Sequence, residues 1–215
     1  MHLASYRFSF SSFIRTATFA SFSLWAVAAS AGAQLYQPLA TSVQAALHAT
    51  VSDSASPEPH FASLEEKASW LSEMSRRLQR RMPDPNGRIE FLKTVHYEAT
   101  RAGIDPQMVL GLIEVESAFR KYAVSSAGAR GFMQVMPFWV GLIGKADQDL
   151  FHLRINLRYG CTILRHYLDI EKGDLFRALG RYNGSLGQPG YPNTVRAAWE
   201  KNWSWNWAPQ QLAQR

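Results

Sequence analysis

The sequence of 215 residues contains a single cysteine, Cys161. One cysteine cannot form a disulfide within the chain, so we expect packing rather than cross-links to hold the fold together. Cys161 also lies far from the N-terminal region, and we therefore expect no lipid-modified N-terminal cysteine and no lipoprotein. Its apolar surroundings are typical of a small core residue.

Clustered metal ligands and runs of basic residues are also missing. The six histidines are scattered and form no His-Glu-x-x-His pattern, so we expect neither a metal nor another cofactor. Without Arg7 and Arg15, 21 of the 23 basic residues remain against 17 acidic ones, a net charge of +4. This mild charge suits an anionic polymer, and without a Lys/Arg run or a recognisable motif we expect no nucleic acid as partner.

The chain has no stretch in which apolar and polar residues alternate long enough to require a β-strand, and it has no internal repeat. Apolar residues with helical spacing recur instead. The predicted fold class is all-α, with a single folded domain that we expect to be monomeric.

The first 33 residues resemble a secretory signal. Arg7 and Arg15 precede the apolar stretch from Phe19 to Ala29, and the small residues 31–33 provide a cleavage pattern before Gln34. The apolar stretch is shorter than the ~20 residues that a membrane-spanning helix needs, although an uncleaved anchor or a buried N-terminal helix are alternatives. We expect export to the periplasm or beyond, with no stable membrane span after processing.

The remaining chain divides by composition. Residues 34–60 end in a stretch rich in Ser and Pro and are predicted to be a flexible linker, with one short helix before that stretch. Residues 61–208 form the predicted domain, and residues 209–215 form a tail. Ser63 and Glu66 form a capping-box pattern that opens a helix reaching about Arg81.

Further helices follow from turn and capping signals. Residues 83–87 indicate a turn, after which a second helix ends at Gly103, and Asp105-Pro106 opens a third. Another helix covers about 157–168 and contains Gly160, where the missing side chain permits a close contact. A short helix precedes Tyr182.

Glu116 interrupts the apolar face of the third helix. It lies seven residues after Val109, on the stripe that Leu112 and Ile113 continue. A carboxyl there must find a partner, such as an arginine, or hold its proton through a raised pKa, which a general acid requires. Periodicity alone leaves both possibilities open. Glu114 points to another side of the helix and is predicted to be solvated or structural.

A glycine-containing segment follows this helix. Gly128 and Gly131 permit positive φ and a close approach of the backbone to a ligand, and the Gly-Lys-Ser/Thr ending of a phosphate-binding loop is absent. Gln134 lies among apolar residues, where a neutral amide could orient the acetamido or hydroxyl groups of a sugar.

Three ordered motifs resemble the catalytic domain of soluble lytic transglycosylases, over roughly residues 88–200. They are Glu116-Ser117-Ala118-Phe119 with Ser125 and the run from Gly128 to Pro137, the Asn-x-x-x-Gly-x-x-x-Leu pattern within residues 156–168, and Ala178-Leu179-Gly180-Arg181-Tyr182-Asn183-Gly184. The sequence departs from the family at Arg120-Lys121, where Asn-Pro is usual, at Phe132 and at Arg181. These departures affect subsite packing and remove no residue that the family uses for bond cleavage.

The resemblance implies a lysozyme-like helical fold of the goose-lysozyme type and a peptidoglycan substrate. It implies that Glu116 is the acid and then the base, and that Ser125, Gln134, Tyr182 and Asn183 line the sugar site. The expected product is a 1,6-anhydromuramic sugar, because the muramic C6 hydroxyl replaces water as the attacking group. Tyr182 is expected to hydrogen-bond Glu116 or the leaving group, or else to be a core tyrosine whose hydroxyl is satisfied.

Two other functions remain open at this stage. A hydrolytic muramidase could use the same scaffold, and a glycan-binding protein without catalysis could serve a cell-envelope assembly or secretion machine. Four tryptophans near the C-terminus could stack on sugars, but Trp203, Trp205 and Trp207 alternate with polar residues and could equally pack onto the domain.

Overall fold

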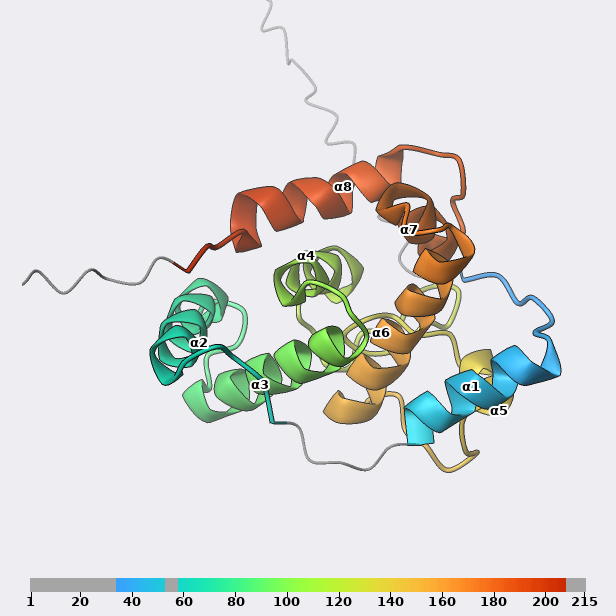
Figure 1. The fold of residues 1–215 in the computed structure, drawn as a ribbon, viewed down its shortest axis with the longest axis horizontal. Helices are drawn as coiled ribbons and strands as arrows, with labels where there is room; N and C mark the ends of the chain where they lie inside the picture. Colours follow the sequence, from blue (N-terminus) through green and yellow to red (C-terminus); the bar gives the residue numbers. More distant parts are fainter. Residues whose placement is uncertain (1–33, 53–57, 208–215) are drawn as a thin grey trace, which may run out of the picture.

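The computed structural model describes residues 34–52 and 58–207, which are helical with no β-strand among them. The all-α prediction is therefore confirmed (Figure 1). The predicted signal peptide and C-terminal tail lie outside these residues. The helices are α1 (Thr41–Ser52), α2 (Leu64–Leu78), α3 (Pro85–Arg101), α4 (Pro106–Ser117), α5 (Phe138–Ile143), α6 (Leu153–Ile170), α7 (Leu175–Asn183), α8 (Gly190–Ala198) and the π-helical turn η1 (Trp199–Trp203).

Acidic and hydroxyl side chains begin four of the helices. Ser63 caps α2 by accepting a hydrogen bond from the Glu66 amide, as the sequence pattern predicts. Asp105 caps α4 directly before Pro106, and Asp84 caps α3 in the same way before Pro85. The segment predicted as a turn at 83–87 therefore contains the first residues of α3. An Asp-Pro pair opens both helices because proline needs no amide partner at the first helical position.

Helix α4 lies at the centre of the molecule, between α8 on one side and α3 on the other (Figure 1). Its residues from Met108 to Ile113 are all buried. At Gly111 a β-carbon would lie 2.8 Å from the backbone nitrogen of Trp199, so a side chain here would clash with backbone. Glycine thus permits η1 to pack directly against α4.

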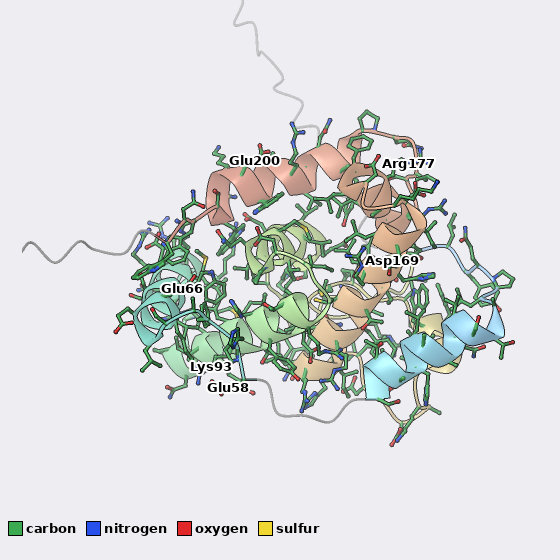
Figure 2. The ribbon with its side chains drawn as sticks, viewed as in Figure 1. Glu58, Glu66, Lys93, Asp169, Arg177 and Glu200 are labelled. Carbon is green, nitrogen blue, oxygen red and sulfur yellow. The ribbon has the colours of Figure 1, made fainter. Side chains whose placement is uncertain are left out.

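Two glutamates, Glu98 and Glu114, connect neighbouring helices through hydrogen bonds and ion pairs. Glu98 on α3 is fully buried and accepts hydrogen bonds from Arg158 on α6, at 2.8 and 3.1 Å, and from Arg101, at 3.1 Å. Glu114 on α4 binds Arg81 at 2.7 Å and the indole N–H of Trp203 at 2.6 Å. Of the alternatives that the sequence left open, Glu114 therefore has the structural role and Trp203 packs onto the domain. The labelled Asp169 and Arg177, in contrast, are exposed (Figure 2).

The N-terminal segment differs from the flexible linker predicted over 34–60. Within it, α1 packs against α5 and α6, and Val51 is buried. The Gln44 side chain donates to the Leu142 carbonyl at 2.6 Å, which attaches α1 to α5. The short helix predicted before the Ser/Pro-rich stretch is present as α1, but residues 34–52 are not a flexible linker. Contacts with residues distant in sequence hold α1 on the domain, and composition does not reveal such contacts.

Helices α5, α8 and η1 were not predicted. Helix α5 has six residues, too few to show a period, and α8 begins with Gly190-Tyr191-Pro192, which signals a turn. Buried Val195 and Trp203 supply the tertiary contacts that override this local signal. No helix in the described ranges 34–52 and 58–207 is long and apolar enough to cross a membrane.

The close contact predicted at Gly160 is present. A β-carbon at Gly160 would lie 2.3 Å from the Met133 sulfur, so α6 packs directly onto the segment that follows α4. We expect Gly160→Ala to lower the free energy of unfolding by about 1–3 kcal/mol, because a packed core must shift to admit the methyl group. Chemical denaturation measures this change.

Gly141 on α5 provides the matched control, since nothing lies within 4 Å of its added β-carbon. Gly141→Ala should raise stability by roughly 0.5–1 kcal/mol through helix propensity. Equal effects of the two substitutions would contradict the close packing at Gly160.

Candidate active site

Glu116 lies in the last turn of α4 and is only 4% exposed. One of its carboxyl oxygens, Oε1, accepts a hydrogen bond from the hydroxyl of Tyr191 on α8. The other, Oε2, is buried and has no hydrogen-bond partner in the part of the chain that the structure describes. Over the same residues, no arginine or lysine forms an ion pair with Glu116. The alternative of a salt-bridged structural carboxyl is therefore not what the structure shows.

Burial without a countercharge controls the protonation of this group. Desolvation raises the pKa of Glu116 to about 8, and the hydrogen bond from Tyr191 lowers it by a smaller amount. Of the two possibilities that the helical pattern left open, an ion-pair partner or a raised pKa, the structure favours the raised pKa. At neutral pH the carboxyl thus holds a proton and can act as a general acid.

The chain turns sharply directly after Glu116 and Ser117. Ala118 and Phe119 both have positive φ, at 50° and 64°, which side-chain-bearing residues adopt at a cost. Packing maintains the turn, since the buried ring of Phe119 contacts Trp203 at a centroid distance of 5.2 Å and Phe91 at 6.0 Å. The turn ends α4 beside its carboxyl and directs the chain into the next segment.

Residues 118–137, here called the site loop, fold back on themselves. Val124 pairs with Arg130, and Arg130 pairs with Val135, through two isolated antiparallel bridges. Ser125 lies half-buried in the first turn, where its hydroxyl accepts from the Ala129 amide at 3.1 Å. The hydroxyl therefore stabilises the turn from a position that is still partly open.

Gln134 is a buried member of the site loop. Its side-chain nitrogen donates to the carbonyls of Gly131, at 2.8 Å, and Ala123, at 3.1 Å, and the residue is 1% exposed. Its own φ is 49°, a further strained position in this loop. The amide predicted to orient a sugar thus also holds the two sides of the loop together.

Asn156 on α6 supports the loop from below. Its side chain accepts from the Met133 amide and donates to the carbonyls of Arg130 and Leu150, each at 2.8 Å. Gly131, with a φ of 76°, allows this contact, because a β-carbon there would lie 2.3 Å from the Asn156 amide nitrogen. The close approach predicted at Gly131 is made to Asn156.

Tyr182 and Asn183 end α7 and are both buried. The Tyr182 hydroxyl donates to the Met133 carbonyl at 2.7 Å. Of the alternatives left open for Tyr182, the hydrogen bond to Glu116 is not formed, and Tyr191 supplies it instead. Tyr182 is a core tyrosine whose hydroxyl is satisfied. It is nevertheless close to Glu116, whose charge adds to the effect of burial in raising the pKa of Tyr182.

Sequence reasoning missed two residues at this site. Tyr191 lies at the start of α8 in a stretch that reads as a turn, and no periodicity connects it with Glu116. Gln34 is 3% exposed and hydrogen-bonds the backbone of Gln134 and Met136, about 100 residues away in sequence. Neither contact leaves a local signal.

The described residues contain no group of three or more His, Cys, Asp or Glu that could hold a metal ion. The chemistry that their geometry supports uses one protonated carboxyl, one tyrosine hydroxyl and a loop of fixed backbone groups. These are the parts of a general acid catalyst.

Comparison with known proteins identifies relatives for most of this region. A family model described as the transglycosylase SLT domain matches residues 93–201, which include Glu116, the site loop and α6 to α8. The chain is 52% identical over 52 residues to the membrane-bound lytic murein transglycosylase C of Actinobacillus pleuropneumoniae serotype 5b, covering 24% of this chain and 14% of the relative.

Two further relatives match over longer stretches. The membrane-bound lytic murein transglycosylase C of Glaesserella parasuis is 51% identical over 96 residues, covering 42% of this chain and 24% of the relative. The transglycosylase of Enterobacteria phage PRD1 is 29% identical over 103 residues, covering 48% and 38%. The chain thus spans well under half the length of these relatives.

Glu116 should make stability depend on pH. Its folded pKa of about 8 lies above the unfolded value of 4.5, so ionisation of the carboxyl does not oppose folding below pH 4.5, and it destabilises the fold increasingly as the pH rises from 4.5 towards 8. We expect Glu116→Gln to have little effect on the free energy of unfolding near pH 4.5. Near pH 8.5 it should stabilise the protein by roughly 2–4 kcal/mol.

Urea denaturation at both pH values measures this difference. Glu200→Gln, on the surface after α8, is the matched control and should change stability equally at the two pH values. A pH-independent effect of Glu116→Gln would show that Glu116 is not a buried, unpaired carboxyl.

Proposed function

Because the chain belongs to the transglycosylase SLT family, we propose that it is a peptidoglycan lytic transglycosylase with Glu116 as its acid and base. The observation that carries the proposal is the buried carboxyl, whose Oε2 has no partner among the described residues and whose pKa is about 8. A structural carboxyl such as Glu98 is instead surrounded by arginines.

The site offers one candidate catalytic carboxyl, Glu116, and this favours a reaction in which no bound water has to be activated. Glycosidases usually employ two, either to form a covalent intermediate or to activate water. Glu114 is the nearest in sequence, but it is held by Arg81, Asn202 and Trp203. The substrate itself can supply the missing nucleophile.

In the proposed reaction Glu116 donates its proton to the oxygen between N-acetylmuramic acid and N-acetylglucosamine, and the bond from the muramic C1 to that oxygen breaks. The muramic N-acetyl group assists this departure. The Glu116 carboxylate then takes the proton of the muramic C6 hydroxyl, whose oxygen bonds to C1. The product is a 1,6-anhydro sugar, and tethering gives the attacking hydroxyl a high effective concentration.

The remaining site residues are proposed to bind the sugar. Ser125 lies at a half-open turn of the site loop, Gln134 is buried within the loop, and Tyr182 contacts the loop from α7. The bonds of Gln134 and Tyr182 to backbone carbonyls fix the loop against α7. Gln134 and Tyr182 would therefore contribute to sugar binding largely by holding backbone groups of the loop in fixed positions. Asn183 is the last residue of α7.

The cellular context follows as part of the same proposal. An N-terminal signal peptide over residues 1–33 would place the domain in the periplasm, or otherwise outside the cytoplasm, where peptidoglycan is found. The catalytic domain is proposed to cover residues 61–208. Residues 34–52 pack onto this domain through α1. Cell-envelope assembly or secretion machines are candidate partners for a wall-cleaving enzyme of this size.

Digestion of purified peptidoglycan tests the reaction. We expect anhydromuropeptides as products, and Glu116→Gln should lower the rate by about 100-fold to 10,000-fold because it removes the proton donor. Mass spectrometry distinguishes the products, since hydrolysis adds water and leaves reducing ends. Reducing-end products would favour a muramidase, and full activity of Glu116→Gln would remove Glu116 from the mechanism.

Tyr191 should tune the same carboxyl. Because its hydrogen bond lowers the pKa of Glu116, Tyr191→Phe should raise that pKa above about 8. The alkaline decline of kcat, which follows loss of the Glu116 proton, should shift to higher pH. A pH profile of kcat measures the shift, and Tyr97→Phe on α3 is the control that should leave the profile in place.

A further inference from the structure

Gln34 makes a two-point contact with the backbone of the site loop. Its side-chain nitrogen lies 3.3 Å from the Gln134 carbonyl oxygen, to which it donates, and its side-chain oxygen accepts from the Met136 amide at 3.1 Å. We call this carbonyl and this N–H the amide notch. The carboxamide is 3% exposed, so the contact is shielded from water.

The amide notch has the hydrogen-bonding pattern of an amide receptor. The Met136 N–H, to which the Gln34 side-chain oxygen is bound, can equally donate to the C=O of an N-acetyl group on a sugar. The N–H of such a trans amide points the other way, so this shared N–H is the group for which Gln34 and an N-acetyl group compete. The backbone on both sides is fixed, because Gln134 binds Gly131 and Ala123, and Asn156 holds the Met133 amide. The backbone of the notch is therefore already in place, and only the Gln34 carboxamide has to leave before a ligand can bind there.

The notch is also close to the candidate acid. The Tyr182 hydroxyl donates to Met133, the residue before Gln134, and the pKa of Tyr182 responds to the Glu116 charge and to a hydrogen bond with Gln34. Tyr182 therefore lies beside both groups. A carboxamide in the notch occupies space next to the place where bond cleavage is proposed.

We propose that Gln34 is an internal competitor for an N-acetyl group of the glycan, and that residues 34–39 cover the site until substrate displaces them. This inference rests on the proposed function, since it takes the N-acetylated glycan as substrate. The carboxamide of Gln34 fills the notch in the free protein. Substrate binding requires its release.

The packing around Gln34 is compatible with release of residues 34–39 from the site loop while α1, which follows them, stays bound to the domain. Leu35 is 63% exposed and Tyr36 is 61% exposed, with Tyr36 meeting Phe138 edge-on at 5.6 Å. Leu35 and Gln37 border a cavity of only about 70 Å³. Beyond them α1 is bound to α5 through Gln44, so Gln34 is the principal buried contact of this segment.

Removal of the carboxamide should strengthen glycan binding. The two hydrogen bonds of the Gln34 side chain each contribute a modest net stabilisation. Because a glycan must displace them, they should weaken its apparent affinity by about 5-fold to 100-fold. We expect Gln34→Ala to lower the Kd for an N-acetylglucosamine tetramer by at least about fivefold. Gln34→Asn, whose shorter side chain cannot span the notch, should behave in the same way.

Isothermal titration calorimetry on the full chain carrying Glu116→Gln measures binding without turnover. Gln37→Ala, in the same segment but outside the notch, is the matched control and should leave the Kd unchanged. A glucosamine tetramer, which lacks N-acetyl groups, tests the chemistry: its weaker binding should not improve in Gln34→Ala. Circular dichroism confirms that each variant is folded.

The outcomes separate this inference from the proposed function. An unchanged or higher Kd in Gln34→Ala, or equal improvement for both tetramers, overturns internal competition even if anhydro products form. A lower Kd that depends on the N-acetyl groups supports it even if product analysis rejects the lytic reaction.

Discussion

The site depends on one constraint, which is the burial of the Glu116 carboxyl without a countercharge at the end of α4. An ionised carboxylate in this position is costly, and the protein avoids most of that cost by keeping the proton until the pH approaches 8. The helices around it must therefore exclude water and basic side chains alike. Within the part of the chain that the structure describes, Tyr191 on α8 hydrogen-bonds one oxygen of this carboxyl, and the other oxygen has no partner.

The contrast with Glu98 shows how the same residue type serves two purposes. Glu98 is fully buried as well, but Arg101 and Arg158 bind it, so that it links α3 with α6 as an ion pair. Glu116 has no such partner among the described residues, and its second oxygen is unpaired. Pairing stabilises the charged form, and isolation stabilises the protonated form. Only the isolated carboxyl is suited to donate a proton at neutral pH.

The site loop has strained backbone angles that contacts from other elements maintain. Positive φ angles at Ala118, Phe119 and Gln134 are unfavourable locally, and buried contacts from other elements maintain them. Asn156 on α6 and Tyr182 on α7 bind the loop backbone directly. The motif residues from three parts of the chain thus meet because they stabilise one loop. That loop presents its backbone polar groups in fixed positions, which is the property that binding a sugar or the Gln34 carboxamide requires.

The sequence by itself determined the helical class, the caps at Ser63 and Asp105, and the anomalous carboxyl at Glu116. These features follow from local hydrogen bonds and from a period of 3.6 residues, which act over a few turns of chain. The tertiary structure alone decided that Tyr191 rather than Tyr182 binds Glu116, that α1 packs onto the domain, and that Gln34 reaches the site loop. Each of these is a contact between segments distant along the chain. Such contacts are selected by packing, which leaves no periodic trace in either segment.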